Sequence, residues 1–204
     1  MRIKCLVLCL LGILLLAGCE EKRVRDAVEK TMIENVRDKK SLKIDKLIIK
    51  KDTVPLFFDK EVSGSLNDFT EATQELKGYE GMSYLWNDER EKARIKQINA
   101  VSEIKTALKS SNPEVQYIAC AECSANNAFG STVSNRVIFV VDKDSKKVLT
   151  WSKVDEDFML RAYALYVAQT GEPLEEDKYG NYKIDQMSFG MQCIFAKSLD
   201  DIKK

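Results

Sequence analysis

The sequence predicts an α+β protein, in which a mostly antiparallel sheet packs against amphipathic helices. Two long segments place apolar residues three and four positions apart, which is the spacing of one helix face. In the middle of the chain, three short apolar segments follow one another with polar turns between them, as the strands of an antiparallel meander do. Together these patterns indicate the α+β class.

The first of the two helices is predicted over residues 22–39, and two strands follow it. Residues 42–50 and 54–58 are rich in Ile, Val and Phe and therefore predict strands. The break between them falls near Asp52 and Pro55, since proline is accepted at a strand start or at a sheet edge. The helix has one apolar stripe, which is formed by Val24, Ala27, Val28, Thr31, Met32 and Val36.

Two more helices are predicted before the meander. Residues 64–81 allow a short helix bounded by glycines. The second long helix begins between Ser83 and Asn87 and ends before Ser110, because Pro113 pushes the residue in front of it out of the helical region. Its apolar stripe consists of Ala93, Ile95, Ile98, Val101, Ile104 and Leu108.

The meander is predicted from three strands, over residues 115–125, 132–141 and 148–151. In its first turn we expect Asn127 and Gly130 to supply positive φ angles. After the meander, Asp155 caps a helix that ends at Gly171, and residues 191–196 are apolar enough for another strand. A cystatin-like or similar helix-on-sheet arrangement is the form of this fold that we expect.

The beginning of the chain has the parts of a secretory signal. Arg2 and Lys4 form a basic start, residues 5–16 are almost uniformly apolar, and small residues lead to Cys19. A helix from residue 5 to residue 19 would reach about 22 Å, short of the ~30 Å hydrocarbon core, so a permanent transmembrane helix is the weaker interpretation. A cleaved signal with a fortuitous cysteine and an uncleaved anchor are the two alternatives to the interpretation that follows.

The run Leu16-Ala17-Gly18-Cys19 resembles the lipobox of bacterial lipoproteins, which have a type II signal peptide. The resemblance implies cleavage between Gly18 and Cys19. Residues 1–18 are then the signal peptide, and residues 19–204 form a single α+β envelope domain. The resemblance also implies acyl chains on Cys19, which attach the protein to the membrane.

Two further resemblances concern the place of the protein in the cell. Glu20, directly after the cysteine, resembles the residue found in lipoproteins that are sent to the outer membrane, which favours that membrane over the inner one. The turn Asn126-Asn127-Ala128-Phe129-Gly130 leads into an apolar strand and a charged turn at 142–147, and it resembles small uncharacterised envelope lipoproteins of the Bacteroidota. This second resemblance implies a β-hairpin in a compact envelope domain and carries no activity.

The charges and the absence of histidine exclude several classes of function. Without the signal peptide the chain has 30 basic and 32 acidic residues, so it has no basic field for nucleic acid. The lack of histidine excludes Ser-His-Asp and Cys-His nucleophile pairs. We predict no metal and no cofactor. The acidic runs at 155–157 and 175–177 fit a helix cap and a surface loop better than cation sites, and no glycine-rich stretch has the spacing of a phosphate-binding loop.

Three cysteines remain once Cys19 and the signal peptide are set aside. Cys120 and Cys123 have C-x-x-C spacing, but residues three apart in a strand point to opposite faces, with Cα atoms ~10 Å apart, too far for a bridge. A disulfide of Cys193 with Cys120 or Cys123 is predicted as one outcome if residues 191–196 form a strand beside the meander. The alternative is three small buried hydrophobic side chains.

By exclusion, the sequence predicts a lipid-anchored cell-envelope protein that acts as a non-catalytic binding module. We expect it to bind another envelope or surface protein through an exposed sheet edge or a concave face. Two alternatives stay open. One is a histidine-free carboxylate hydrolase acting on envelope glycans, which needs a cleft with two acids ~5 to 10 Å apart. The other is an immunity or inhibitor protein that is held in the envelope against a secreted toxin.

Overall fold

A computed structural model of the chain confirms the α+β class. The structure describes residues 2–79, 87–144, 146–177 and 181–202, with side chains described from residue 18 onward. The chain divides into two compact units, each built from two separate parts of the sequence. Unit 1 consists of residues 1–52 and 116–151 and contains the sheet, whereas unit 2 consists of residues 53–115 and 152–204 and is mainly helical. No linker or repeat in the sequence indicates this division, and the single domain over residues 19–204 stays a prediction.

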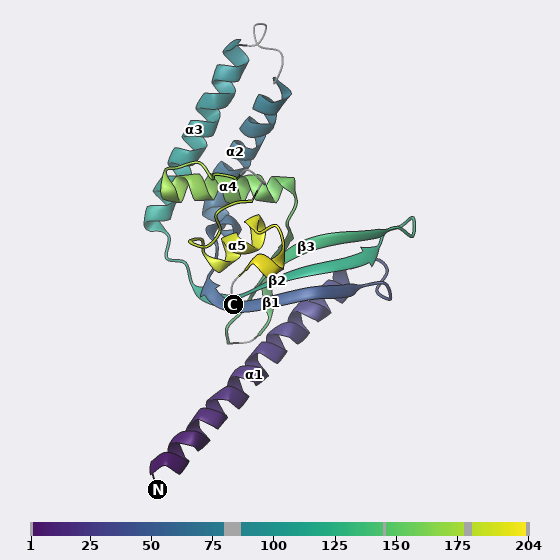
Figure 1. The fold of residues 1–204 in the computed structure, drawn as a ribbon. Helices are drawn as coiled ribbons and strands as arrows, with labels where there is room; N and C mark the ends of the chain where they lie inside the picture. The colour runs from purple at the N-terminus through teal and green to yellow at the C-terminus, as the bar shows by residue number, and fades with distance from the viewer. Residues whose placement is uncertain (1, 80–86, 145, 178–180, 203–204) are drawn as a thin grey trace. The chain divides into compact units, whose positions relative to one another are not determined.

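Unit 1 contains one long helix and a four-stranded antiparallel sheet (Figure 1). The strands lie in the order β1-β2-β3-β4, so β1 and β4 form the two edges. β2 and β3 pair from Tyr117 opposite Val141 to Asn126 opposite Thr132, which confirms the predicted hairpin to within one residue. The elements are α1 (Arg2–Asn35), β1 (Lys43–Thr53), β2 (Val115–Asn126), β3 (Thr132–Val141) and β4 (Val148–Lys153).

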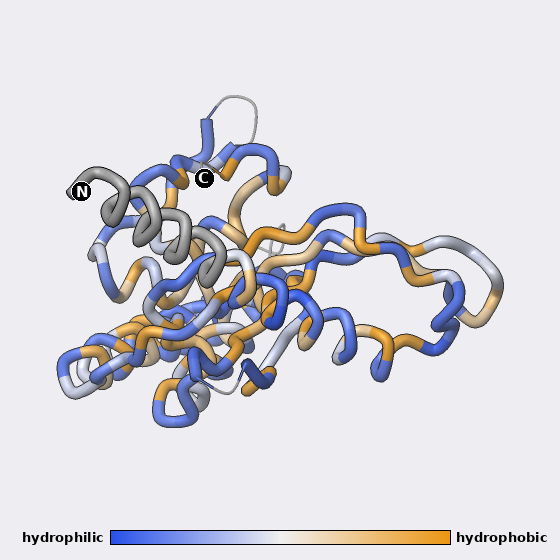
Figure 2. The backbone as a smooth tube through the Cα atoms, turned by 90° about the horizontal axis from the view of Figure 1, so that it is seen from below, coloured by the Kyte–Doolittle hydropathy of each residue, from blue (hydrophilic) through white to orange (hydrophobic). Residues whose placement is uncertain are grey.

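The core of unit 1 lies between α1 and the sheet. Val24, Val28 and Met32 form one stripe on α1 and are buried, as the sequence predicted. They pack against every second residue of the two central strands, because successive side chains of a strand point to opposite faces. Figure 2 shows the hydrophobic segments that run through these strands. The sheet residues in this core are Tyr117, Ala119, Ala121, Cys123, Val137, Phe139 and Val141.

The end of α1 and the conformation of the β2–β3 turn differ from the predictions. α1 ends at Asn35 rather than near residue 39, and the Asn35 side chain donates to the carbonyl of Thr31 at 2.8 Å, which satisfies an acceptor of the last turn. In the β2–β3 turn Gly130 has a φ of 79°, as expected, but Asn127 has no positive φ. Asn127 instead stabilises the turn through its side-chain oxygen, which accepts hydrogen bonds from the N–H groups of Phe129 and Ser131.

Unit 2 is built mainly from helices. α2 and α3 lie side by side, and α4 contacts both of them (Figure 1). Its apolar interior includes the rings of Phe57 and Phe158, whose centroids are 4.9 Å apart in an edge-to-face arrangement. The elements are η1 (Leu56–Phe58), α2 (Lys60–Gly78), α3 (Asn87–Ser110), α4 (Glu156–Thr170), α5 (Phe189–Phe195) and η2 (Leu199–Asp201).

The described boundaries of α3 and α4 agree with the sequence predictions to within one residue. α3 runs from Asn87 to Ser110. Its start was predicted between Ser83 and Asn87, and residues 83–86 lie outside the described part of the chain. Asp155 caps α4 by accepting from the backbone N–H of Phe158 at 3.0 Å. Gly171 ends α4 with a φ of 77°. These signals act between near neighbours and are therefore readable locally.

The predicted strand at residues 54–58 is wrong. Pro55 is followed by the single turn η1, and Asp59 then caps α2 by accepting from the N–H of Glu61 at 2.9 Å. This cap starts α2 at Lys60, so Gly64 lies inside the helix rather than at its start. A short apolar run beside a proline allows a strand or a turn, and packing decides between them.

The predicted strand at residues 191–196 is also wrong, since this run belongs to α5. Nearly all of its side chains are buried, so the segment shows no alternation that would have separated helix from strand. The stripe of α3 is correct only in part. Ala93, Ala100 and Ile104 are buried, whereas Ile95 and Ile98 are exposed, the latter by 66%.

Candidate functional site

Cys19 lies on α1, shortly before the residues that pack on the sheet. It is exposed, and the first inward-facing residue after it is Val24. The backbone of α1 continues through the predicted signal segment, but the side chains of residues 1–17 lie outside the described part of the structure. Within the described part of the chain, no helix has the length and apolar character needed to cross a membrane.

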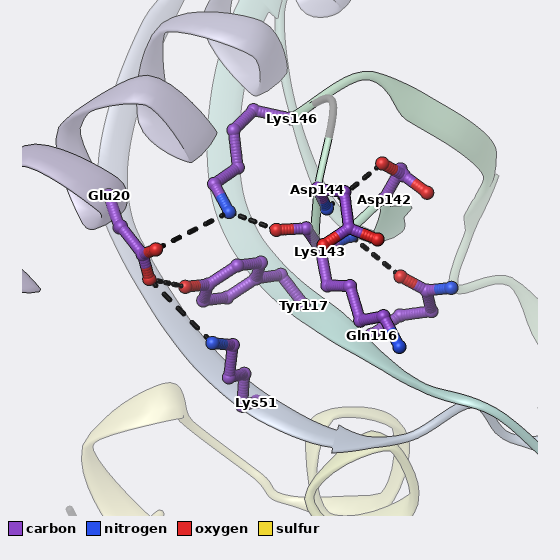
Figure 3. Close-up of polar contacts among 8 residues, drawn as sticks. All are labelled: Glu20, Lys51, Gln116, Tyr117, Asp142, Lys143, Asp144 and Lys146. Carbon is purple, nitrogen blue, oxygen red and sulfur yellow. Dashed lines mark hydrogen bonds and ion pairs between the residues drawn. The ribbon is translucent and has the colours of Figure 1, made fainter.

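The residue after Cys19 is held against the sheet by three side chains (Figure 3). The hydroxyl of Tyr117 on β2 donates a hydrogen bond to the Glu20 carboxylate. The ammonium groups of Lys51 on β1 and of Lys146 in the β3–β4 turn lie 3.6 and 3.8 Å from the same carboxylate. We call these four residues, Glu20, Lys51, Tyr117 and Lys146, the Glu20 cluster.

The two lysines of the Glu20 cluster also flank the aromatic ring. Their Nζ atoms lie 4.9 Å (Lys51) and 4.8 Å (Lys146) from the centroid of the Tyr117 ring, within the range of cation–π attraction. The ring therefore separates two ammonium groups that would repel each other, while its hydroxyl meets the carboxylate that attracts both. One carboxylate and two ammonium groups leave the cluster with one excess positive charge.

The turn that carries Lys146 is held by its own hydrogen bonds. The N–H of Lys143 donates to the side-chain oxygen of Gln116 at 2.7 Å, and the N–H of Asp144 donates to the Asp142 carboxylate at 3.0 Å (Figure 3). Lys146 itself has a φ of 55°, which is uncommon for a residue with a side chain. This conformation accompanies a lysine whose side chain is only 10% exposed, so the turn presents Lys146 to the cluster rather than to solvent.

The electrostatics of the Glu20 cluster oppose proton transfer near neutral pH. The hydrogen bond from Tyr117, followed by the charges of Lys146 and Lys51, lowers the pKa of the Glu20 carboxyl. Burial, followed by the hydrogen bond with Glu20, raises the pKa of the Tyr117 hydroxyl. The carboxylate thus stays ionised and the phenol stays protonated. This arrangement positions the chain rather than providing an acid or a base.

The three other cysteines with described side chains are all buried, and they lie on two different elements. Cys120 and Cys123 both lie on β2. Cys123 belongs to the apolar core between α1 and the sheet, whereas Cys120 does not, as strand alternation predicts. The Cys123 thiol donates to the carbonyl of Asn135 at 3.5 Å, and burial raises its pKa, which makes it a poor nucleophile. Cys193 is buried on α5, so the strand that motivated a bridge to Cys120 or Cys123 is absent there, and the bridge stays a prediction.

Unit 2 contains an open groove of about 640 Å³ beside the end of α4. Three acids line it, Glu172, Glu175 and Asp185, and all three are exposed. Glu175 also pairs with Lys183 at 3.5 Å. The groove therefore offers three carboxylates that are open to solvent.

The acidic runs that the sequence singled out have structural roles. Besides Asp155 at the cap, Glu156 pairs with Lys77 at 2.7 Å on the surface of unit 2. The Asp177 carboxylate accepts from the N–H of Asn181 at 2.9 Å and so closes a loop. Across the described residues, no group of three or more histidine, cysteine, aspartate and glutamate side chains could hold a metal ion.

Sequence reasoning missed the Glu20 cluster. Alternation along residues 115–125 could have placed Tyr117 on the same face as Ala119 and Ala121, but no local signal pairs residue 20 with residues 51, 117 and 146. No family model, curated protein or solved structure matches this chain. The functional argument therefore depends on the residues of the chain itself.

Proposed function

We propose that this chain is a lipid-anchored protein of the bacterial cell envelope, held in the membrane by acyl chains on Cys19, and that it acts by binding a partner protein. The sequence Leu16-Ala17-Gly18-Cys19 supports the attachment, since it resembles a lipobox. Glu20 in the next position favours the outer membrane. Each buried CH₂ of an acyl chain contributes ~0.8 kcal/mol of membrane affinity, so two or three chains hold a protein stably.

The observation that carries the proposal is that Cys19 is exposed, while the next residue, Glu20, is bound to side chains of the sheet. An exposed cysteine is accessible to the enzymes that would acylate it. Glu20, the next residue, contacts Tyr117, Lys51 and Lys146 on the sheet. A lipid on Cys19 would therefore hold unit 1 close to the bilayer, because almost no free chain separates the anchor from the sheet.

The test replaces Cys19 by Ser in the full-length chain, with Cys9→Ser as the matched control inside the same segment. With a labelled fatty acid in the growth medium, the unaltered protein and the Cys9→Ser variant should take up label and partition with membranes. Cys19→Ser should take up none and should accumulate with its signal segment attached. Unchanged labelling and processing of Cys19→Ser would refute the lipid anchor, whatever the protein binds.

Binding is favoured over catalysis by the chemistry that the chain has available. It has no histidine, the Cys123 thiol is buried with a raised pKa, and in the Glu20 cluster the pKa of the Glu20 carboxyl is lowered while that of the Tyr117 hydroxyl is raised. An immunity or inhibitor protein would be a special case of such a binding protein. The identity of the bound protein would distinguish the special case from the general one.

The groove in unit 2 supports one second candidate, a carboxylate hydrolase of envelope glycans. It brings Glu172, Glu175 and Asp185 to the walls of a single groove, and that chemistry also requires two of these carboxyl groups to lie ~5 to 10 Å apart. The purified protein can be incubated with envelope glycan, and the reducing ends released by it can be compared with those from the Glu172→Gln and Asp185→Asn variants. Equal release by all three proteins, at the level of the buffer, would exclude this candidate.

A further inference from the structure

The end of the β2–β3 hairpin carries no charged side chain. Lysine, arginine, aspartate and glutamate make up 31% of the sequence, yet none of them occurs between Glu122 and Arg136. A segment of this length would otherwise carry about four of them. Glu122 and Arg136 pair with each other at 2.7 Å and mark the base of the uncharged segment. We call residues 123–135 the arm.

The hydrogen bonds of the hairpin continue along the arm to its tip. Its strands stay paired up to Asn126 opposite Thr132. In the turn, the side-chain oxygen of Asn127 accepts from the N–H groups of Phe129 and Ser131 at 2.9 and 3.0 Å, and Gly130 takes the left-handed conformation. These bonds fix the backbone on both sides of Phe129, so a partner would pay little conformational entropy to bind it.

Phe129 is the most exposed large hydrophobic residue of the described chain, at 92%. Val133 on the same arm is 39% exposed, and Ile33 on the last turn of α1 is 44% exposed. α1 ends at this end of the sheet, where the N–H of Asn126 donates to the Ser41 hydroxyl in the loop after the helix, at 2.8 Å. Among the described residues of unit 1, three exposed large apolar side chains thus belong to the arm or to the last turn of α1, and two others, Leu149 and Trp151, lie on edge strand β4.

This end lies opposite the candidate lipid anchor. α1 runs from Cys19 to Ile33 along the sheet, and at ~1.5 Å per residue these positions are about 21 Å apart. The Glu20 cluster holds the start of this segment at Tyr117, while the arm begins six residues further along β2. An anchor on Cys19 would therefore leave the arm free for a contact away from the site of acylation.

We propose that the arm is the partner-binding surface of this protein, and that its partner is a folded envelope protein with an uncharged pocket that accepts the Phe129 ring. The inference rests on the proposed function and names the surface that carries it out. Centres of protein interfaces are depleted in charge and enriched in aromatic residues, which describes the arm. A segment that binds a bilayer surface would carry lysine or arginine for anionic headgroups, and the arm has neither.

The test places a photoreactive amino acid at position 131 on the arm of the full-length chain in living cells, and at position 149 on edge strand β4 as the comparison. Both native residues are exposed. Irradiation should join position 131 to one other protein. Phe129→Ala should abolish that product, whereas Ala128→Ser, an exposed neighbour, should leave it. After the joined protein is identified and purified, Phe129→Ala should weaken its binding by at least about 30-fold, as loss of an interface anchor does.

The outcomes separate this inference from the proposed function. Products of position 131 that contain lipid alone, a second copy of this chain, or no other molecule would overturn the arm as the binding surface. A protein joined only at position 149 would overturn the arm and leave the proposed function standing. Loss of acylation would be seen in the labelling experiment on Cys19, which is independent of irradiation. Phe129→Ala removes an exposed side chain, so unfolding does not explain a lost product.

Discussion

The two ends of the sheet in unit 1 show opposite uses of an aromatic side chain. At one end, Tyr117 is buried among a carboxylate and two ammonium groups, and its contacts hold Glu20 on α1 against the sheet. At the other end, Phe129 is surrounded by uncharged residues and is almost fully exposed. Charged groups around a buried ring secure a contact within the protein. An exposed ring without charged neighbours has no partner inside unit 1 and suits a contact with another molecule.

The largest expected effect separates two phenylalanines ten positions apart on the same hairpin. Phe139 is 1% exposed in the core under α1, so Phe139→Ala should lower the free energy of unfolding by about 3 to 5 kcal/mol. Phe129→Ala should change it by no more than about 0.5 kcal/mol, because that ring contacts mainly water. Urea unfolding of the two variants checks this difference. Equal losses of stability would mean that the arm is part of the folded core.

The next effect concerns the rigidity of the arm. Gly130 has a φ of 79°, and Gly130→Ala should cost about 1 to 2 kcal/mol in the turn, because a side chain disfavours this conformation. Gly64→Ala, in the second turn of α2, is the matched control and should instead stabilise the protein by about 0.5 to 1 kcal/mol, since its new methyl group meets no atom within 4 Å. Hydrogen exchange of the amides of residues 124–134 should rise only in Gly130→Ala. Unchanged exchange would show that the turn does not depend on Gly130.

A smaller effect is expected at the buried ring of the charged end. Tyr117→Phe keeps the ring between Lys51 and Lys146 and removes only the hydroxyl that donates to Glu20. The loss of one such hydrogen bond should lower the free energy of unfolding by about 0.5 to 1.5 kcal/mol. Tyr117→Leu removes the ring as well and should cost more. If both variants have the stability of the unaltered protein, the cluster does not secure α1.

The smallest effect is the pH dependence that Glu20 introduces. Its pKa lies below the ordinary value of 4.5 in the folded state, mainly because of the hydrogen bond from Tyr117. Such a carboxyl contributes stability above the pKa of the unfolded chain and loses it as the pH falls through the lower folded pKa. The difference in unfolding free energy between the unaltered protein and Glu20→Gln should be constant from about pH 6 to about pH 8 and should shrink as the pH falls through the folded pKa of Glu20. A difference that grows on acidification would contradict the assignment.

Local sequence signals were sufficient for much of the fold. β3 occupies the predicted residues, and α4 begins after Asp155 and ends at Gly171. Alternation and caps operate over a few residues, so they are visible before the chain is folded. Residues 54–58 and 191–196 were predicted as strands and form η1 and α5, because short apolar runs have no distinct period and packing selects their conformation.

The candidate functional features also divide into those visible in the sequence and those that depend on folding. The motif ending at Cys19 and the uncharged run from residue 123 to residue 135 are properties of the sequence, since each is continuous along the chain. The contact of Glu20 with Lys51, Tyr117 and Lys146 joins four separate segments, and the exposure of Phe129 against the burial of Phe139 depends on which strand residues α1 covers. Charge and apolar character belong to single residues. Which of them meet a neighbour and which meet solvent is set by folding, because it brings distant segments into contact.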